Sequence, residues 1–144
     1  MTMDIKSIVQ ECKDSNNFDV LVNWVPYART IGMGCMKAGD EIIFTLPANE
    51  DNIGNPTLPA IHGGVLGGFI EQSAILFVLM IAEQPKFPKV VDLSIDYLSA
   101  GHYRDSFAQC RALRVGRRLA NIQVSAWQDK KEQPIATARA NLLL

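Results

Sequence analysis

One apolar segment, residues 63–82, constrains the fold of this chain more than any other feature. The segment is about long enough to cross a bilayer as a helix. However, Glu71 and Gln72 lie at its centre, and a pair of glycines interrupts it. These residues favour the buried core helix of a globular protein, without membrane association. We expect the helix to end at about Glu83, because prolines follow.

The rest of the chain shows the patterns of short helices and strands. Apolar residues recur at helical spacing in residues 3–13, and residues 18–24 predict a second short helix or a turn. Alternation in the second half places Val91 on the same face as Leu93 and Ile95. Strands are expected at 27–35, 41–47, 89–98, 106–115, 120–128 and 133–144. Because consecutive strands with short turns form antiparallel sheets, and one all-apolar helix suits a sheet with a single core face, we predict an α+β fold.

Length and charge bound the domain organisation and the partners. The chain has 144 residues and 15.9 kDa, which is the size of a single domain, 1–144, with residues 1–18 as an N-terminal helical extension. Lys and Arg number 14 and Asp and Glu 15, so the net charge of -1 argues against a nucleic-acid partner. A mean hydropathy of +0.06 is slightly apolar, which indicates either a large core or a subunit interface.

The cysteines and the N-terminus indicate the compartment. Cys12, Cys35 and Cys110 form no CxxC motif and no even-numbered set, so we expect neither a disulfide framework nor a zinc or redox site. The N-terminal segment carries acidic residues and lacks the basic and apolar regions of a signal peptide. We therefore expect a cytoplasmic protein with reduced thiols, without metal or cofactor.

The junction at the start of the long helix is the most informative segment for chemistry. A loop punctuated by Asn, Gly and Pro covers residues 49–59, and His62, Gly63 and Gly64 then open the helix. A helix start exposes unpaired amide groups at the positive end of the dipole, and glycine lets a ligand approach them. Such a site can polarise a carbonyl oxygen. Alternatively, His62 simply caps the helix, and the glycines serve helix packing.

Glu71 lies seven residues after Gly64, so the two residues share one face of the helix. Gly67 and Gly68, between them, leave this part of the helix bare. Each glycine destabilises a helix interior by about 1 kcal/mol relative to alanine, which indicates close contact with a neighbouring helix or a thin ligand. A carboxylate inside an apolar helix is rarely buried without a partner or a role, so Glu71 is the first candidate for catalysis.

These residues resemble the hotdog-fold acyl-CoA thioesterases, in particular the PaaI-type group. In that family a His-Gly-Gly opens the central helix and an acidic residue follows nine positions after the histidine, as His62 and Glu71 do here. The element order is similar from about residue 19 to 144, and the similar stretches are 91–98, 116–120 and 135–140. The resemblance implies an antiparallel sheet wrapped around one central helix. It also implies hydrolysis of acyl-CoA, with active sites built across the interface of a homodimer or a dimer of dimers.

The resemblance further implies roles for individual residues. Glu71 would activate water or attack the thioester carbonyl, and the Gly63 amide would hold the oxyanion. The family often has Asn or Gln six residues before the histidine; Pro56 stands there, and Asn55 beside it is the candidate replacement.

Substrate binding is expected at the bare helix face and at one hairpin turn. Gly64, Gly67 and Gly68 would let the acyl-CoA approach the helix, and Arg117 and Arg118 would bind the CoA phosphates, unless they are only a solvated turn.

Two other functions fit the same fold. A non-catalytic module that binds acyl-CoA or lipid would explain the incomplete polar shell around Glu71. A hotdog dehydratase would need a catalytic histidine where Asp51 stands, so dehydration is the weaker interpretation.

Overall fold

The computed structural model describes residues 4–144, so Met3, the first residue of the expected N-terminal helix, lies outside the described part. Four α-helices are present in this part: α1 (Ile5–Ser15), α2 (Asp19–Trp24), α3 (Pro26–Ile31) and α4 (Gly63–Ile81). The strands are β1 (Gly34–Ala38), β2 (Glu41–Leu46), β3 (Ile53–Asn55), β4 (Ala60–Ile61), β5 (Lys89–Tyr97), β6 (Ser106–Val115), β7 (Leu119–Trp127) and β8 (Ala136–Leu143). A 3-10 turn, η1 (Glu50–Asn52), precedes β3.

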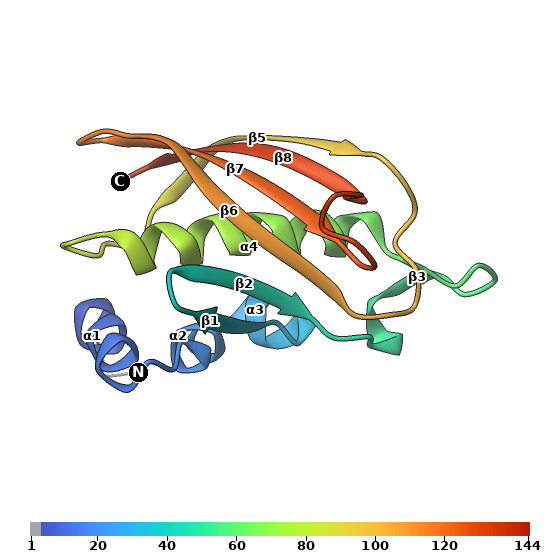
Figure 1. Ribbon diagram of the computed structural model, residues 1–144, viewed down its shortest axis with the longest axis horizontal. Helices are drawn as coiled ribbons and strands as arrows, with labels where there is room; N and C mark the ends of the chain where they lie inside the picture. Colours follow the sequence, from blue (N-terminus) through green and yellow to red (C-terminus); the bar gives the residue numbers. More distant parts are fainter. Residues whose placement is uncertain (1–3) are drawn as a thin grey trace.

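Six strands form one antiparallel sheet in the order β1-β2-β6-β7-β8-β5, and β3 and β4 form a separate small hairpin (Figure 1). The inward-facing residues of β7 and β8 are small or aliphatic and fully buried, as at Ala120, Ile122, Val124 and Ala140. β5 is an edge strand, with no neighbour in the described chain beyond β8. The predicted α+β architecture, an antiparallel sheet wrapped around one long helix, is confirmed.

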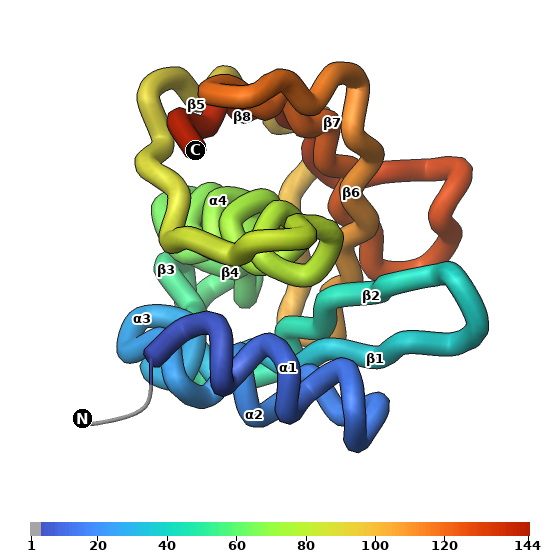
Figure 2. Tube along the Cα trace, turned by 90° about the vertical axis from the view of Figure 1, so that its left-hand side faces the viewer, coloured from blue at the N-terminus to red at the C-terminus, as the bar shows by residue number. Residues whose placement is uncertain are grey.

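The sheet curves around α4, and helices α1 to α3 cover the side of α4 opposite the sheet (Figure 2). α4 meets the length and composition of a membrane span, with a mean hydropathy of 1.9, but 67% of that window is buried within the fold. Phe69, Ile70, Leu76 and Leu79 are completely or almost completely buried in the core. The expectation of a buried core helix is therefore confirmed. On the side of α4 between β5 and α3, Figure 2 shows the segment that links α4 to β5 and the β3–β4 hairpin.

A strand is expected at residues 27–35, but this range holds most of α3 and only the first two residues of β1. The prediction of a strand there is therefore wrong. Pro26 occupies the first position of α3, where its missing N–H is not needed. Gly32 ends the helix with a φ of 82°, a conformation that favours glycine, and its N–H bonds back to Ala28 and Arg29. Ala28 and Ile31 share the buried face. The proline and glycine at the two ends were the sequence signals for this short helix.

A β-bulge in β5 changes which side chains at the start of the strand point toward the core. Val90 lies opposite Leu142 and Asp92 opposite Asn141, so Val91 is the extra residue. Val91 is 53% exposed, while Val90 packs on the core with Leu93 and Ile95. The expected position of Val91 on the core face is therefore wrong, because one inserted residue reverses the alternation before it.

Candidate active site

His62 caps the start of α4. Its backbone is non-helical (φ -57°, ψ 127°), and its Nδ1 accepts a hydrogen bond of 2.9 Å from the Gly64 amide. Since Nδ1 is the acceptor, the neutral ring carries its proton on Nε2. The His62 carbonyl also accepts the amides of Val65 and Leu66, each at 3.0 Å. The capping interpretation of His62 is confirmed, and the side chain of this residue is exposed.

The Gly63 amide is the exception in this first turn. The next three amides all bond to His62, whereas the Gly63 N–H has no acceptor among residues 4–144. Gly63 is exposed, and a Cβ added to it would meet no atom within 4 Å. An open, unpaired amide at the positive end of a nineteen-residue helix can bind an anion or a carbonyl oxygen.

Tyr97, at the end of β5, holds the first turn of α4 from the other side. Its Oη donates a hydrogen bond of 2.8 Å to the Gly63 carbonyl. Gly67 makes room for this contact, because an added Cβ would lie 3.0 Å from the Tyr97 Oη and 3.1 Å from Ile95 Cδ1. The Gly63–Gly64 peptide is therefore clamped, with its carbonyl on Tyr97 and its amide on His62.

Asn52 joins the segment before α4 to the end of α3. Its side chain is buried, and Nδ2 donates to the Ile31 carbonyl at 2.8 Å. Its own carbonyl accepts the His62 amide at 2.9 Å. One residue thus fixes the entry to α4 against the helix that precedes the sheet.

Glu71 is half-buried on α4, two turns after the helix start. Its carboxylate makes no hydrogen bond or ion pair within residues 4–144. Glu71 lies eight positions after Gly63, and the rise of an α-helix places the two backbones about 12 Å apart. In a single chain, therefore, Glu71 and the Gly63 amide do not act on the same atom.

Tyr27 of α3 lies against α4 at Gly68. A Cβ added to Gly68 would overlap the Tyr27 Oη and would lie 2.7 and 2.8 Å from its Cε2 and Cζ. The glycine therefore accommodates a phenol ring of the same chain. The contact between α3 and α4 depends on the tertiary fold, so the sequence alone does not reveal it. The side chain is 40% exposed.

Asn55 is the last residue of β3, a strand at the same end of the molecule as the start of α4 (Figure 1). Its Oδ1 accepts bonds from the Thr57 amide at 3.0 Å and the Thr57 hydroxyl at 2.6 Å. The oxygen thus holds the local turn. The substitution of Asn55 for the family's polar residue remains a prediction.

Arg117 and Arg118 lie in the β6–β7 turn, at the opposite end of the molecule from the helix start (Figure 1). With Arg114 and Asn121 they line a surface hollow of about 560 Å³. The Asn121 Oδ1 is buried and has no partner among the described residues. Three guanidinium groups around one hollow favour a multiply charged anion.

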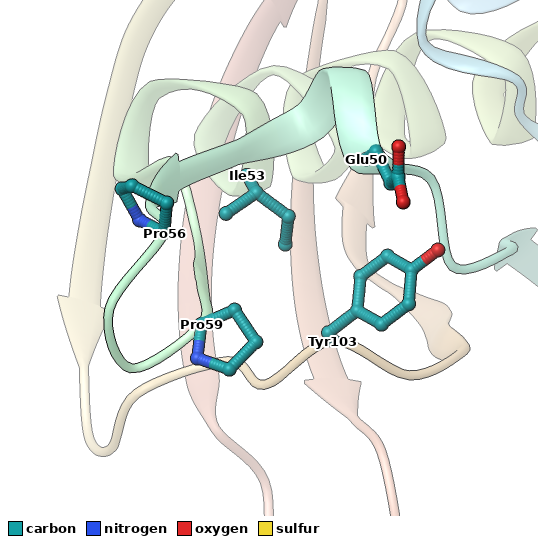
Figure 3. A pocket seen from close by; sticks show the side chains of 5 residues that line it. All are labelled: Glu50, Ile53, Pro56, Pro59 and Tyr103. Atoms are coloured by element: carbon teal, nitrogen blue, oxygen red, sulfur yellow. The ribbon is translucent and has the colours of Figure 1, made fainter.

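A second hollow, of about 400 Å³, lies beside the loop that precedes α4 (Figure 3). It is lined by Glu50, Ile53, Pro56, Pro59 and Tyr103, none of which belongs to α4. In the described part of the chain, no three His, Cys, Asp or Glu side chains gather to hold a metal ion.

The cysteines are free thiols in the described chain. Burial, with a smaller contribution from the Asp19 carboxylate, raises the pKa of Cys35 to about 12. Burial likewise raises the pKa of Cys110 and of Cys12. Thiols that stay protonated at neutral pH are poor nucleophiles.

Comparison with known proteins identifies the family. The family model of the thioesterase superfamily matches residues 58–135, from the loop before α4 to the turn before β8. The chain belongs to the thioesterase superfamily. A solved structure from Chromobacterium violaceum is 34% identical, with a TM-score of 0.77 over 94% of this chain and 95% of that chain. A comparison with curated proteins found no match.

Two solved structures with lower sequence identity share the fold of this member of the thioesterase superfamily. The phenylacetic acid degradation protein PaaI from Thermus thermophilus is 15% identical, with a TM-score of 0.69 over 83% of this chain and 98% of that chain. A Streptococcus mutans protein bound to acetyl-CoA is 18% identical, with a TM-score of 0.66 over 78% and 87%. The family match and the shared fold confirm the resemblance to hotdog-fold thioesterases.

Proposed function

We propose that this protein hydrolyses acyl-CoA thioesters to a free acid and CoA. The observation that carries the proposal is the unpaired Gly63 amide at the start of the helix that also bears Glu71. Glu71 takes a proton from water as the water attacks the thioester carbonyl carbon, and the Gly63 N–H binds the developing oxyanion. The carbonyl then re-forms, the C–S bond breaks, and the proton passes to the CoA sulfur.

The proposal includes a homodimer, because the two groups lie about 12 Å apart along one helix. Two α4 helices packed antiparallel would bring Glu71 of one copy toward the Gly63 amide of the other. The edge of β5, which pairs with no other strand of the described chain beyond β8, is available for such packing. An edge strand of nine residues is itself a ready surface for pairing with a second chain.

The hollow around Arg117 and Arg118 supports the choice of CoA as the thiol. It lies at the end of the molecule where α4 finishes, far from the Gly63 of its own chain (Figure 1). In an antiparallel pair, it would lie on the same side as the partner's helix start. We propose that Arg114, Arg117 and Arg118 bind the CoA phosphates. The acetyl-CoA held by the Streptococcus mutans structure supports a CoA ligand for this fold.

Two substitutions test the proposal, each designed to remove one group only. Glu71→Gln keeps the shape of the side chain and removes the base, and we expect a loss of about 10²-fold or more in kcat. Gly63→Pro removes only the free amide: proline is well accepted at the first helical position, and the extended backbone of His62 suits a following proline. We expect it to fold normally and to lose about 10²–10³-fold in kcat.

The measurement is CoA release from a panel of acyl-CoAs, followed with a thiol reagent, together with thermal melting of each variant. Folded variants with wild-type rates would overturn the assignment of Glu71 and Gly63. If acyl-CoAs raise the melting temperature of the wild type but release no CoA, the protein is a binding module and not a hydrolase. Hydration of an enoyl thioester without hydrolysis would instead identify a dehydratase.

A further inference from the structure

Tyr27 occupies the face of α4 that carries Glu71. Gly68 lies four residues after Gly64 and three before Glu71, so the three positions follow one another along one side of the helix. The Tyr27 ring covers the middle position, since an added Cβ at Gly68 would overlap its hydroxyl. A phenol group from α3 therefore lies between the helix start and the carboxylate.

Helix geometry places the Tyr27 hydroxyl within reach of Glu71. Residues three apart on a helix have Cβ atoms about 5–6 Å from each other. The hydroxyl lies against the ideal Cβ position of Gly68, three residues before Glu71, so it is on the stretch of α4 that the Glu71 side chain can reach. Three bonds connect the Glu71 Cβ to its carboxylate oxygens, and side chains on a helix lean over the preceding turn. That turn is the one that Tyr27 covers.

Both groups are without a partner in the described chain. The Tyr27 hydroxyl forms no hydrogen bond within residues 4–144, in contrast to Tyr97, whose hydroxyl is bonded to the Gly63 carbonyl. The Glu71 carboxylate accepts none in that range either. A phenol donates a hydrogen bond and a carboxylate accepts one, and such charge-assisted bonds are short and strong.

We propose that Tyr27 is a positioning residue for Glu71: the two groups are not hydrogen-bonded to each other in the single chain, and a rotation of the Glu71 side chain in the assembled active site lets the Tyr27 Oη–H donate a hydrogen bond to its carboxylate. The bond holds the carboxylate in one orientation toward the reacting water, so it acts on the rate of the chemical step and not on substrate binding. Gly68 is the residue that permits this arrangement. The inference rests on the proposed function, in which Glu71 is the base.

The test is a double-mutant cycle on acyl-CoA hydrolysis, with Tyr27→Phe, Glu71→Gln and the double variant. Tyr27→Phe keeps the ring on Gly68 and removes only the hydroxyl. We expect kcat to fall about tenfold to a hundredfold, with KM changed less than about twofold, because a bond to a charged group is lost. In the Glu71→Gln background the same substitution should have almost no further effect, since Tyr27 acts through Glu71.

Two further variants separate this role from packing. Gly68→Ala keeps the helix and pushes the Tyr27 ring away, so it should lower kcat as Tyr27→Phe does without lowering the melting temperature. Tyr103→Phe is the matched control: Tyr103 is 44% exposed, lines the hollow beside the loop, and should keep the wild-type kcat.

The outcomes distinguish the two proposals. A wild-type kcat for Tyr27→Phe, alongside a strongly reduced kcat for Glu71→Gln, would overturn the role of Tyr27 and leave the proposed function standing. Equal losses from Tyr27→Phe in the wild-type and Glu71→Gln backgrounds would also overturn it. A wild-type kcat for Glu71→Gln would instead overturn the proposed function itself.

Discussion

Replacing His62 separates the structural role of this residue from a chemical one. Three hydrogen bonds at the start of α4 end on His62, and two of them use its backbone carbonyl, which any residue supplies. Only the bond from the Gly64 amide to Nδ1, at 2.9 Å, belongs to the side chain. His62→Ala therefore removes one capping bond and leaves the other two.

The magnitude follows from that single bond. Loss of an N-cap side chain lowers the free energy of unfolding by about 1 kcal/mol. For a domain of this size the loss corresponds to a fall of about 3–4 °C in the melting temperature. His62→Asn restores an acceptor of the type preferred at this position, so we expect its melting temperature to return to the wild-type value.

Thermal denaturation and CoA release, measured on the same preparations, check this prediction. We expect His62→Asn to recover activity along with stability, because the cap holds the peptide next to the Gly63 amide. A melting temperature for His62→Ala equal to the wild type would refute the capping argument. A stable but inactive His62→Asn would show that the Nε2 of His62 takes part in the chemistry.

Three further predictions follow from the geometry of the site and its surroundings. Tyr97→Phe removes the 2.8 Å bond to the Gly63 carbonyl, so differential scanning fluorimetry should show a loss of about 1 kcal/mol, and kcat should fall with it. Replacing Arg117 and Arg118 with alanine should raise KM for acyl-CoA about tenfold or more, and should leave the hydrolysis of a truncated acyl-pantetheine unchanged. The pKa of Cys35 is raised to about 12, so its thiol should resist alkylation at pH 8 until the protein unfolds. The same raised pKa means that only the unfolded thiol ionises near pH 8.5, so urea midpoints should fall as the pH rises above that value.

Local patterns predict most of the fold, because the periodicity of apolar residues indicates the core helix and the strands. Proline, glycine and polar turn residues indicate where these elements end. The helix from Gly63 ends at Ile81, close to the expected end at Glu83. The short helix after Pro26 escaped prediction because six residues give too little periodicity to distinguish it from a strand. Likewise, the bulge at Val91 is a single-residue change of register that only pairing with β8 reveals.

In the candidate site, too, the sequence predicts the local features and does not predict the contacts between distant parts of the chain. The capping position of His62 and the open Gly63 amide follow from a His-Gly-Gly before an apolar helix, so the sequence predicts the local part of the site. The contacts of the two inner glycines do not follow, because Gly67 meets Tyr97 from β5 and Gly68 meets Tyr27 from α3. Those tyrosines reach α4 from distant parts of the chain, and only the packing of the elements brings them together.

Asn52 makes the end of α3 and the start of α4 a single mechanical unit. Its buried side chain bonds to the Ile31 carbonyl, and its carbonyl bonds to the His62 amide. Tilting one helix end relative to the other would break a bond shielded from water, which costs about 1–3 kcal/mol for an unpaired buried group. These two bonds couple the position of α3, which carries Tyr27, to the start of α4, which carries the Gly63 amide.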